Sequence, residues 1–246
     1  HKIAYVNLKG SGGDSYSLVC YHPSQLSDPQ KQDLLPVWYL PWSGDHVTKM
    51  RILSADLVPQ GQVNPNIFFT SALSGCSIFV KGPANSPTVF HAGFDSNRDY
   101  VANPKQDPDS IRHWQILFDR YSPNTPNRGE ANKGQYLADL ANNPDLQVYL
   151  NYLKTTAHGN LVIRSLIGEG NFFGIRNATG NWAFYLQEVV TVQYQTFTVR
   201  KRYLGLGGKE TIYGATQNYR RPMCLREIYP NGGGTARIWN TEPMKI

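Results

Sequence analysis

One cysteine and one histidine stand in local contexts that favour joint chemistry. Cys76 follows Ser74-Gly75, where the chain leaves a tight turn and enters an apolar run, and His91 closes the next apolar run. A cysteine beside a histidine can act as a nucleophile, because the imidazole takes the thiol proton. Backbone N–H groups exposed in a turn such as Ser74-Gly75 could bind the oxyanion that forms when a thiolate attacks a carbonyl group. Cys76 and His91 are therefore a candidate catalytic pair.

The spacing of the two residues suggests how a hairpin could bring them together. If Cys76–Val80 and Pro87–His91 pair around the intervening turn, the simplest register puts Cys76 directly opposite His91. Opposed residues share a face of the sheet, with Cβ atoms roughly 4.5–5.5 Å apart. A slip of one residue would turn one of the two side chains to the other face.

The remaining cysteines and histidines are weaker candidates. An inert buried cysteine and a hydrogen-bonded surface histidine are the alternative interpretation of Cys76 and His91 themselves. Cys20 and His22 would share a face of one strand, but neither follows a glycine turn. His46, His113 and His158 show none of the spacings that are typical of metal ligands. The sequence therefore predicts no metal site.

Strands dominate the elements that must position these residues, since short apolar or alternating runs bounded by turn residues recur along the chain. The predicted strands are Ile3–Leu8, Tyr16–Tyr21, Leu34–Leu40, Met50–Leu53, Ile67–Thr70, Cys76–Val80, Thr88–His91, Trp114–Asp119, Leu161–Ile167, Trp182–Gln187, Val189–Arg200 and Met223–Ile228.

Two helices interrupt the strands. Apolar residues at helical spacing predict them over Glu130–Asn142 and Asp145–Thr156, and Pro144 suits the start of the second. Gly205–Lys209 lacks the spacer and the Ser/Thr of a phosphate loop and is predicted to be a turn. Trp38 and Trp42 are interpreted as core packing.

Composition limits the class of protein. The chain has 246 residues, of which 40% are hydrophobic, 12% aromatic and 17% charged, which excludes a disordered chain and favours one strand-rich domain over residues 1–246. No apolar run is long enough to span a membrane. The balance of 24 Lys+Arg against 18 Asp+Glu indicates an acidic partner or ordinary solvation. Three cysteines without a close pair predict reduced thiols and a cytosolic site of action, and the first residues show no signal pattern.

A larger set of residues around this pair carries a family resemblance. Trp38–Trp42, Phe68-Phe69-Thr70, Leu73-Ser74-Gly75-Cys76 and the downstream His91 resemble the Burkholderia lethal factor family of toxins. The Leu-Ser-Gly-Cys element with a later histidine is shared with the catalytic domain of cytotoxic necrotizing factors. The resemblance covers about residues 38–91. It implies an α+β fold, a β-sandwich of mixed sheets with outer helices.

The resemblance also implies an activity, protein-glutamine deamidation by a bacterial toxin. Carried over by position, Cys76 matches the nucleophile, His91 the general base and Thr70 the third residue of the site, which would orient His91. The turn at Ser74 and Gly75 would supply oxyanion donors, and neither metal nor cofactor is needed.

The implied partner is a host protein. By resemblance to the lethal factor, the target is the DEAD-box RNA helicase of eukaryotic translation initiation, and its deamidation halts host translation. Rho-family GTPases, the targets of necrotizing factors, are the alternative. Such a toxin is made in the bacterial cytoplasm and acts in the host cytosol.

Three other functions stay open from the residues. A transglutaminase would use the same pair of residues if an amine replaced water. A papain-like protease is disfavoured, because its cysteine opens a helix and Cys76 opens a predicted strand. A non-enzymatic, basic β-sandwich that binds RNA or glycan would explain the charge and the aromatic residues without Cys76.

Overall fold

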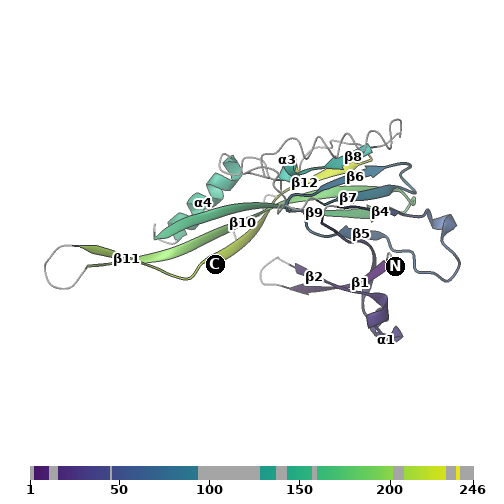
Figure 1. Cartoon of the computed structure of the whole chain (residues 1–246), viewed down its shortest axis with the longest axis horizontal. Coiled ribbons are helices and arrows are strands. Elements are labelled where there is room, and N and C mark those ends of the chain that lie inside the picture. The colour runs from purple at the N-terminus through teal and green to yellow at the C-terminus, as the bar shows by residue number, and fades with distance from the viewer. Residues whose placement is uncertain are drawn as a thin grey trace.

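Two β-sheets packed against each other make up most of the protein (Figure 1). The computed structural model describes residues 3–10, 16–44, 46–93, 128–136, 143–156, 160–201, 208–230 and 237–238. Within these, the large sheet has the strand order β13 (Arg237–Ile238), β12 (Gln217–Tyr229), β10 (Trp182–Lys201), β9 (Leu161–Arg176), β5 (Ile67–Thr70), β3 (Leu35–Leu40), β1 (Ile3–Gly10) and β2 (Tyr16–Tyr21), and β11 (Lys209–Tyr213) also pairs with β10. The small sheet has the order β4 (Val47–Arg51), β7 (Thr88–Ala92), β6 (Ser77–Lys81) and β8 (Arg128–Ala131).

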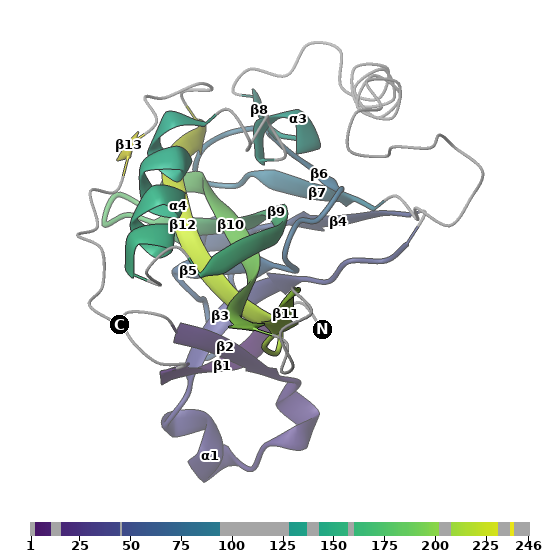
Figure 2. The same ribbon diagram turned by 90° about the vertical axis from the view of Figure 1, so that its left-hand side faces the viewer.

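The large sheet is mixed, because β3 and β5 run parallel while its other described pairings are antiparallel. The helices α1 (Asp28–Gln32), α3 (Lys133–Tyr136) and α4 (Pro144–Thr156) lie outside the two sheets (Figure 2). The predicted fold, an α+β β-sandwich with outer helices, is confirmed. None of the described helices has the length and apolar character needed to cross a membrane.

Alternation along the strands builds the core between the sheets. In the small sheet, Ile78 and Val80 of β6 point toward the large sheet, whereas Phe79 belongs to a separate cluster on the other face. In the large sheet, Phe68, Phe172 and Phe184 form the centre of the core, with the rings of Phe172 and Phe184 stacked 5.6 Å apart. The core therefore lies between β5 and β7, which carry Thr70 and His91, and next to Cys76, which immediately precedes β6.

Three long strands continue beyond the sandwich. Residues 161–167 of β9, 191–201 of β10, 217–221 of β12 and all of β11 form a projection that we call the arm (Figure 1). Helix α4 covers one face near the base of the arm, where its leucines pack against Val190 and Val192 of β10. Pro144 is the first residue of α4, as predicted, because proline fits the first helical turn.

Some sequence predictions are wrong. Arg128–Ala131 forms strand β8, so the helix predicted over Glu130–Asn142 does not begin at Glu130; α3 begins at Lys133, and residues 137–142 lie outside the described part. Pairing with β6 explains this strand, since residues 128–131 complete the edge of the small sheet. The strand predicted at Trp114–Asp119 and most of the turn at Gly205–Lys209 also lie outside the described residues.

Other corrections concern strand limits and one tryptophan. The predicted strands Trp182–Gln187 and Val189–Arg200 form a single strand, β10, whose pairing with β12 shifts register between Glu188 and Val189. Trp38 is buried as predicted, but Trp42 is 46% exposed. It lies beyond the end of β3, where its indole rests on Gly93 instead of in the core.

The aromatic core leads to the first prediction, which concerns Gly174. A Cβ atom at Gly174 would lie 2.6 Å from the ring of Phe184, which is itself packed between Phe68 and Phe172. We expect Gly174→Ala to lower the free energy of unfolding by about 1–3 kcal/mol, since the ring cannot shift without straining its neighbours. Urea unfolding measures this, with Val148→Ala on the exposed face of α4 as the control, expected to stay within about 0.5 kcal/mol. Equal stability of Gly174→Ala and the unchanged protein would contradict the packing described.

Candidate active site

A hydrogen bond between side chains of the two sheets lies at the centre of the candidate site. Thr70, the last residue of β5 in the large sheet, lies 2.7 Å through its Oγ1 from Nδ1 of His91 on β7 in the small sheet. The same Thr70 Oγ1 lies 2.7 Å from the carbonyl oxygen of Leu40, its partner residue on the parallel strand β3. Thr70 and His91 are thus in direct contact between the two sheets.

These contacts fix the tautomer of His91. The Thr70 hydroxyl has one proton, and it donates that proton to the Leu40 carbonyl, which can only accept. Thr70 Oγ1 must therefore accept from His91, so the proton of the neutral ring sits on Nδ1. The lone pair then lies on Nε2, which is buried and has no hydrogen-bond partner among the described residues. Because an unsatisfied buried polar atom is costly, such an atom is a candidate for a functional role.

Burial keeps the His91 ring neutral. The side chain is 0% exposed, and this desolvation lowers the pKa of His91 to about 4. Among the residues that the structure describes, no carboxylate contributes to this shift in pKa, and the ring contact that orients the imidazole is to an uncharged hydroxyl. At neutral pH, His91 is consequently a base with a vacant Nε2.

Cys76 lies immediately before β6 and faces the same interior space, so the strand predicted over Cys76–Val80 begins one residue later, at Ser77. It is 6% exposed and belongs to the core cluster with Ile78 and Val80, two and four residues along, so it faces the large sheet. The predicted register is wrong, because β6 and β7 pair Ile78, not Cys76, with His91. This is a shift of two residues, which preserves the face, so Cys76 becomes a diagonal neighbour of His91 instead of its direct partner.

The turn before Cys76 is anchored to the large sheet. Leu73 exchanges two backbone hydrogen bonds with Gly170 of β9, at 2.7 and 2.8 Å, and its side chain is fully buried. A Cβ at Gly170 would come within 3.3 Å of Leu73, so the absence of a side chain permits this close approach. Only Ser74 and Gly75 then separate Leu73 from Cys76, and the anchored leucine limits where the thiol can lie.

Tyr136 holds the turn from the other side and was not singled out as a site residue from the sequence. Its hydroxyl, on α3, donates to the carbonyl oxygen of Cys76 at 2.5 Å and accepts from the backbone N–H of Gly75 at 3.1 Å. Burial raises the pKa of Tyr136, and the neighbouring Cys76 thiol raises it further. The hydroxyl therefore stays protonated and able to donate at physiological pH.

The predicted oxyanion donors lie in this turn. Ser74 is exposed and Gly75 is half-buried, with a positive φ of 155° that L side chains rarely adopt. The Gly75 N–H is already donated to Tyr136, so its use by an oxyanion, which stays a prediction, requires the Tyr136 hydroxyl to give it up.

The other two cysteines occupy different surroundings. Cys20 is exposed on β2, and partial desolvation raises its pKa. Cys224 is buried on β12, where desolvation and then the Glu188 carboxylate raise its pKa to about 12. Both thiols are therefore protonated at neutral pH. Among the described residues, no group of three or more His, Cys, Asp or Glu side chains is placed to hold a metal ion.

Comparison with known proteins adds no family assignment, since no protein-family model and no curated protein matches the chain.

The second prediction tests the inter-sheet hydrogen bond. Thr70→Val keeps the shape of the side chain but leaves His91 Nδ1–H buried without its acceptor, so we expect the free energy of unfolding to fall by about 1–3 kcal/mol. Thr70→Ser retains the hydroxyl and should recover most of that loss. Urea unfolding gives the stabilities, and ¹⁵N NMR of the imidazole gives the tautomer. A Thr70→Val protein with unchanged stability and the Nδ1–H tautomer would refute the bond.

The third prediction follows from the low pKa of His91. The unfolded chain binds a proton at His91 below about pH 6.5, whereas the folded protein binds it only below about pH 4. The contribution of neutral His91 to stability is therefore complete above pH 6.5 and is lost as the pH falls toward 4, by about 3 kcal/mol in total. Comparing urea unfolding of the protein and of His91→Gln across this range isolates the effect. A stability difference between the two that does not change with pH would contradict the buried, neutral ring.

Proposed function

We propose that this protein is a protein-glutamine deamidase that uses Cys76 as its nucleophile. The observation that carries the proposal is the neutral, buried His91 imidazole, oriented by Thr70 and with an unpartnered Nε2 on the face that Cys76 shares. The resemblance of residues 38–91 to the lethal factor family supports the same activity. Thr70 acts as a positioning residue, because it touches His91 rather than a substrate.

The first half of the reaction forms a thioester. As Cys76 Sγ attacks the carboxamide carbon of a glutamine side chain, His91 Nε2 takes the thiol proton. The resulting imidazolium keeps its Nδ1–H hydrogen bond to Thr70 Oγ1, while the Thr70 hydroxyl still donates its own proton to the Leu40 carbonyl. Collapse of the tetrahedral intermediate breaks the C–N bond, and His91 gives its proton to the leaving ammonia.

The second half regenerates the enzyme. A water molecule attacks the thioester carbon while His91 Nε2, neutral again, takes one of its protons. The C–S bond breaks, the proton returns to the Cys76 sulfur, and a glutamate side chain leaves. The same imidazole thus serves as base and acid in both halves, which suits a residue with one fixed and one free ring nitrogen.

The burial of Cys76 and His91 favours a substrate that reaches the site through a narrow side chain on the surface of a protein. Cys76 and His91 expose 6% and 0% of their surfaces, so a broad group could not reach the thiol. A glutamine carries its carboxamide on a narrow two-carbon stem, and the surrounding loops of the enzyme would meet the surface of the partner protein. We propose the translation-initiation DEAD-box helicase as the target, with Rho-family GTPases as the alternative.

The fourth prediction tests this activity. Cys76→Ser should fold normally and lose deamidation, because a serine hydroxyl is a much weaker nucleophile with a single neutral imidazole as its base. The measurement is peptide mass spectrometry of the folded helicase after incubation, which finds the glutamine converted to glutamate. Cys20→Ser and Cys224→Ser are matched controls and should retain most of the activity, since both thiols lie outside the site.

Three results separate the parts of the proposal. Deamidation that persists in Cys76→Ser would remove the thiol mechanism. Preferential conversion of a Rho-family GTPase would change the target and leave the chemistry intact. Incorporation of an added polyamine at the glutamine, in place of hydrolysis, would make the protein a transglutaminase.

A further inference from the structure

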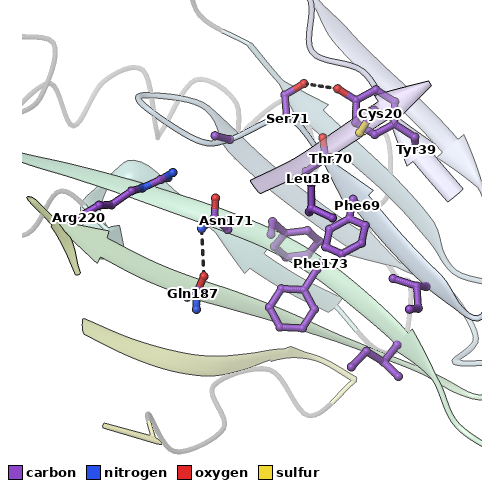
Figure 3. A pocket seen from close by; sticks show the side chains of 14 residues that line it. Leu18, Cys20, Tyr39, Phe69, Thr70, Ser71, Asn171, Phe173, Gln187 and Arg220 are labelled. Atoms are coloured by element: carbon purple, nitrogen blue, oxygen red, sulfur yellow. Dashed lines mark hydrogen bonds between the residues drawn. The ribbon is translucent and has the colours of Figure 1, made fainter. Parts of the chain in front are cut away.

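The face of the large sheet that points away from the small sheet carries a pocket of about 650 Å³ (Figure 3). Phe69 and Phe173 lie in its middle, with Leu18 and Cys20 of β2 on one side and Arg220 of β12 at the opposite end. The pocket shares Thr70 with the candidate active site, but along β5 the Phe69 ring points outward, whereas Phe68 belongs to the core and the Thr70 hydroxyl contacts His91 between the sheets.

An aromatic row crosses this face. Phe69, Phe173 and Tyr185 come from the adjacent strands β5, β9 and β10, with ring centroids of Phe69 and Phe173 6.3 Å apart and those of Phe173 and Tyr185 5.5 Å apart. All three are only half-buried, although large aromatic side chains are usually placed in the core. Aromatic rings that lie side by side on a sheet and stay accessible offer platforms for planar groups.

Hydrogen-bonding groups border the row. The side-chain amides of Asn171 and Gln187, next along β9 and β10, are joined by a bond of 3.0 Å from Asn171 Nδ2 to Gln187 Oε1 (Figure 3). This leaves the Gln187 amide nitrogen and the Asn171 amide oxygen for a ligand. Arg220 follows, 2.9 Å from Glu169 in an ion pair whose arginine side chain is 52% exposed. Such an exposed pair is weak, so the guanidinium can exchange its partner for a phosphate group.

The arm continues from Arg220 and is strongly basic. Its described strands contain one acidic residue, Glu210, and six cationic residues, Arg164, Arg200, Lys201, Lys209, Arg220 and Arg221. The net charge of the whole chain is +6, so this projection holds most of the excess. Exposed apolar side chains lie among the cations, with Val199 at 51% and Tyr213 at 48% exposure.

One face of the arm presents an ordered set of polar side chains. Arg164 lies 4.6 Å from the ring centre of Tyr213 and donates through Nε to Gln195 Oε1 at 2.6 Å. The Gln195 amide in turn donates to Thr216, at 3.0 Å. A guanidinium stacked on an accessible tyrosine and bonded through Nε is positioned by both contacts, and its terminal nitrogens carry further N–H groups that can bind an anion.

We propose that this outer face and the arm bind single-stranded nucleic acid, with a base on the Phe69–Phe173 row and the phosphates along Arg220 and Arg164. Phosphate binding accounts for the six cations against one acid, and base stacking accounts for the accessible rings beside free amide groups. An acidic protein partner would explain the excess of cations but not the accessible aromatic rings. Protein interfaces are depleted of charge at their centres, whereas nucleic-acid interfaces are polar and basic, as the arm is.

The fifth prediction is tested by fluorescence anisotropy with the full chain and a fluorescein-labelled oligouridylate of about 12 nucleotides. We expect salt-sensitive binding that Arg164→Gln/Arg220→Gln weakens by about tenfold or more, with the magnitude of the slope of log K against log salt reduced by about 1.4 for the two lost phosphate contacts. Phe173→Leu, which keeps an apolar side chain, should weaken binding roughly tenfold without changing that slope. Phe173→Tyr should bind as the unchanged protein does.

Controls make each outcome decisive. Arg51→Gln removes an exposed cation from β4 of the small sheet and should leave binding unchanged. Circular dichroism and thermal unfolding verify that each variant is folded. The same measurement with single-stranded DNA of matching sequence shows whether the protein prefers RNA or DNA. Binding to either one supports the proposal. Absence of binding at low salt, tighter binding to duplex RNA, equal binding to polyglutamate, or insensitivity to both the arginine and the Phe173 changes would overturn it.

Discussion

The hydrogen bond from His91 to Thr70 joins the two sheets at the point where the chemistry would occur, and much of the fold serves it. Thr70 can accept from the imidazole only because its own proton goes to the Leu40 carbonyl, and that carbonyl is within reach because β3 and β5 run parallel side by side. The core between the sheets excludes water from the ring and keeps it neutral. Changing the packing of either sheet would therefore alter both the protonation and the orientation of the His91 imidazole.

Strand alternation gives the large sheet two different faces, one packed against the small sheet and one carrying the aromatic row. Along β5, the Phe68 ring packs in the core and the Thr70 hydroxyl contacts His91, whereas Phe69 points outward into the aromatic row. Ser71 then ties the loop to Tyr39, through a hydrogen bond of 3.0 Å between the two hydroxyls (Figure 3). A segment of only a few residues thus connects the buried His91–Thr70 contact to the outward-facing aromatic row.

The sequence was sufficient for the features that depend on local pattern. Alternation and turn residues located most strands, and the face shared by Cys76 and His91 was correct because a pairing error of two residues preserves it. The register itself was wrong, since the hairpin turn, and not the apolar pattern, sets the pairing. Strand β11 has five exposed residues and so no alternation to detect. The role of Tyr136 depends on a contact between α3 and a turn some sixty positions earlier in the chain, which no local signal encodes.

The central claim, that His91 Nε2 is the base for the Cys76 thiol, is tested most directly by the pH dependence of alkylation with iodoacetamide, whose carboxamide resembles the substrate. Peptide mapping follows Cys20, Cys76 and Cys224 separately in the folded protein. Because His91 is neutral above about pH 4, the account predicts that the rate at Cys76 changes little between about pH 5 and pH 8, whereas the rate at exposed Cys20 rises about tenfold per pH unit. It also predicts that buried Cys76 reacts faster than Cys20 at neutral pH. A Cys76 rate that rises as steeply as that of Cys20 and stays below it throughout would contradict the account.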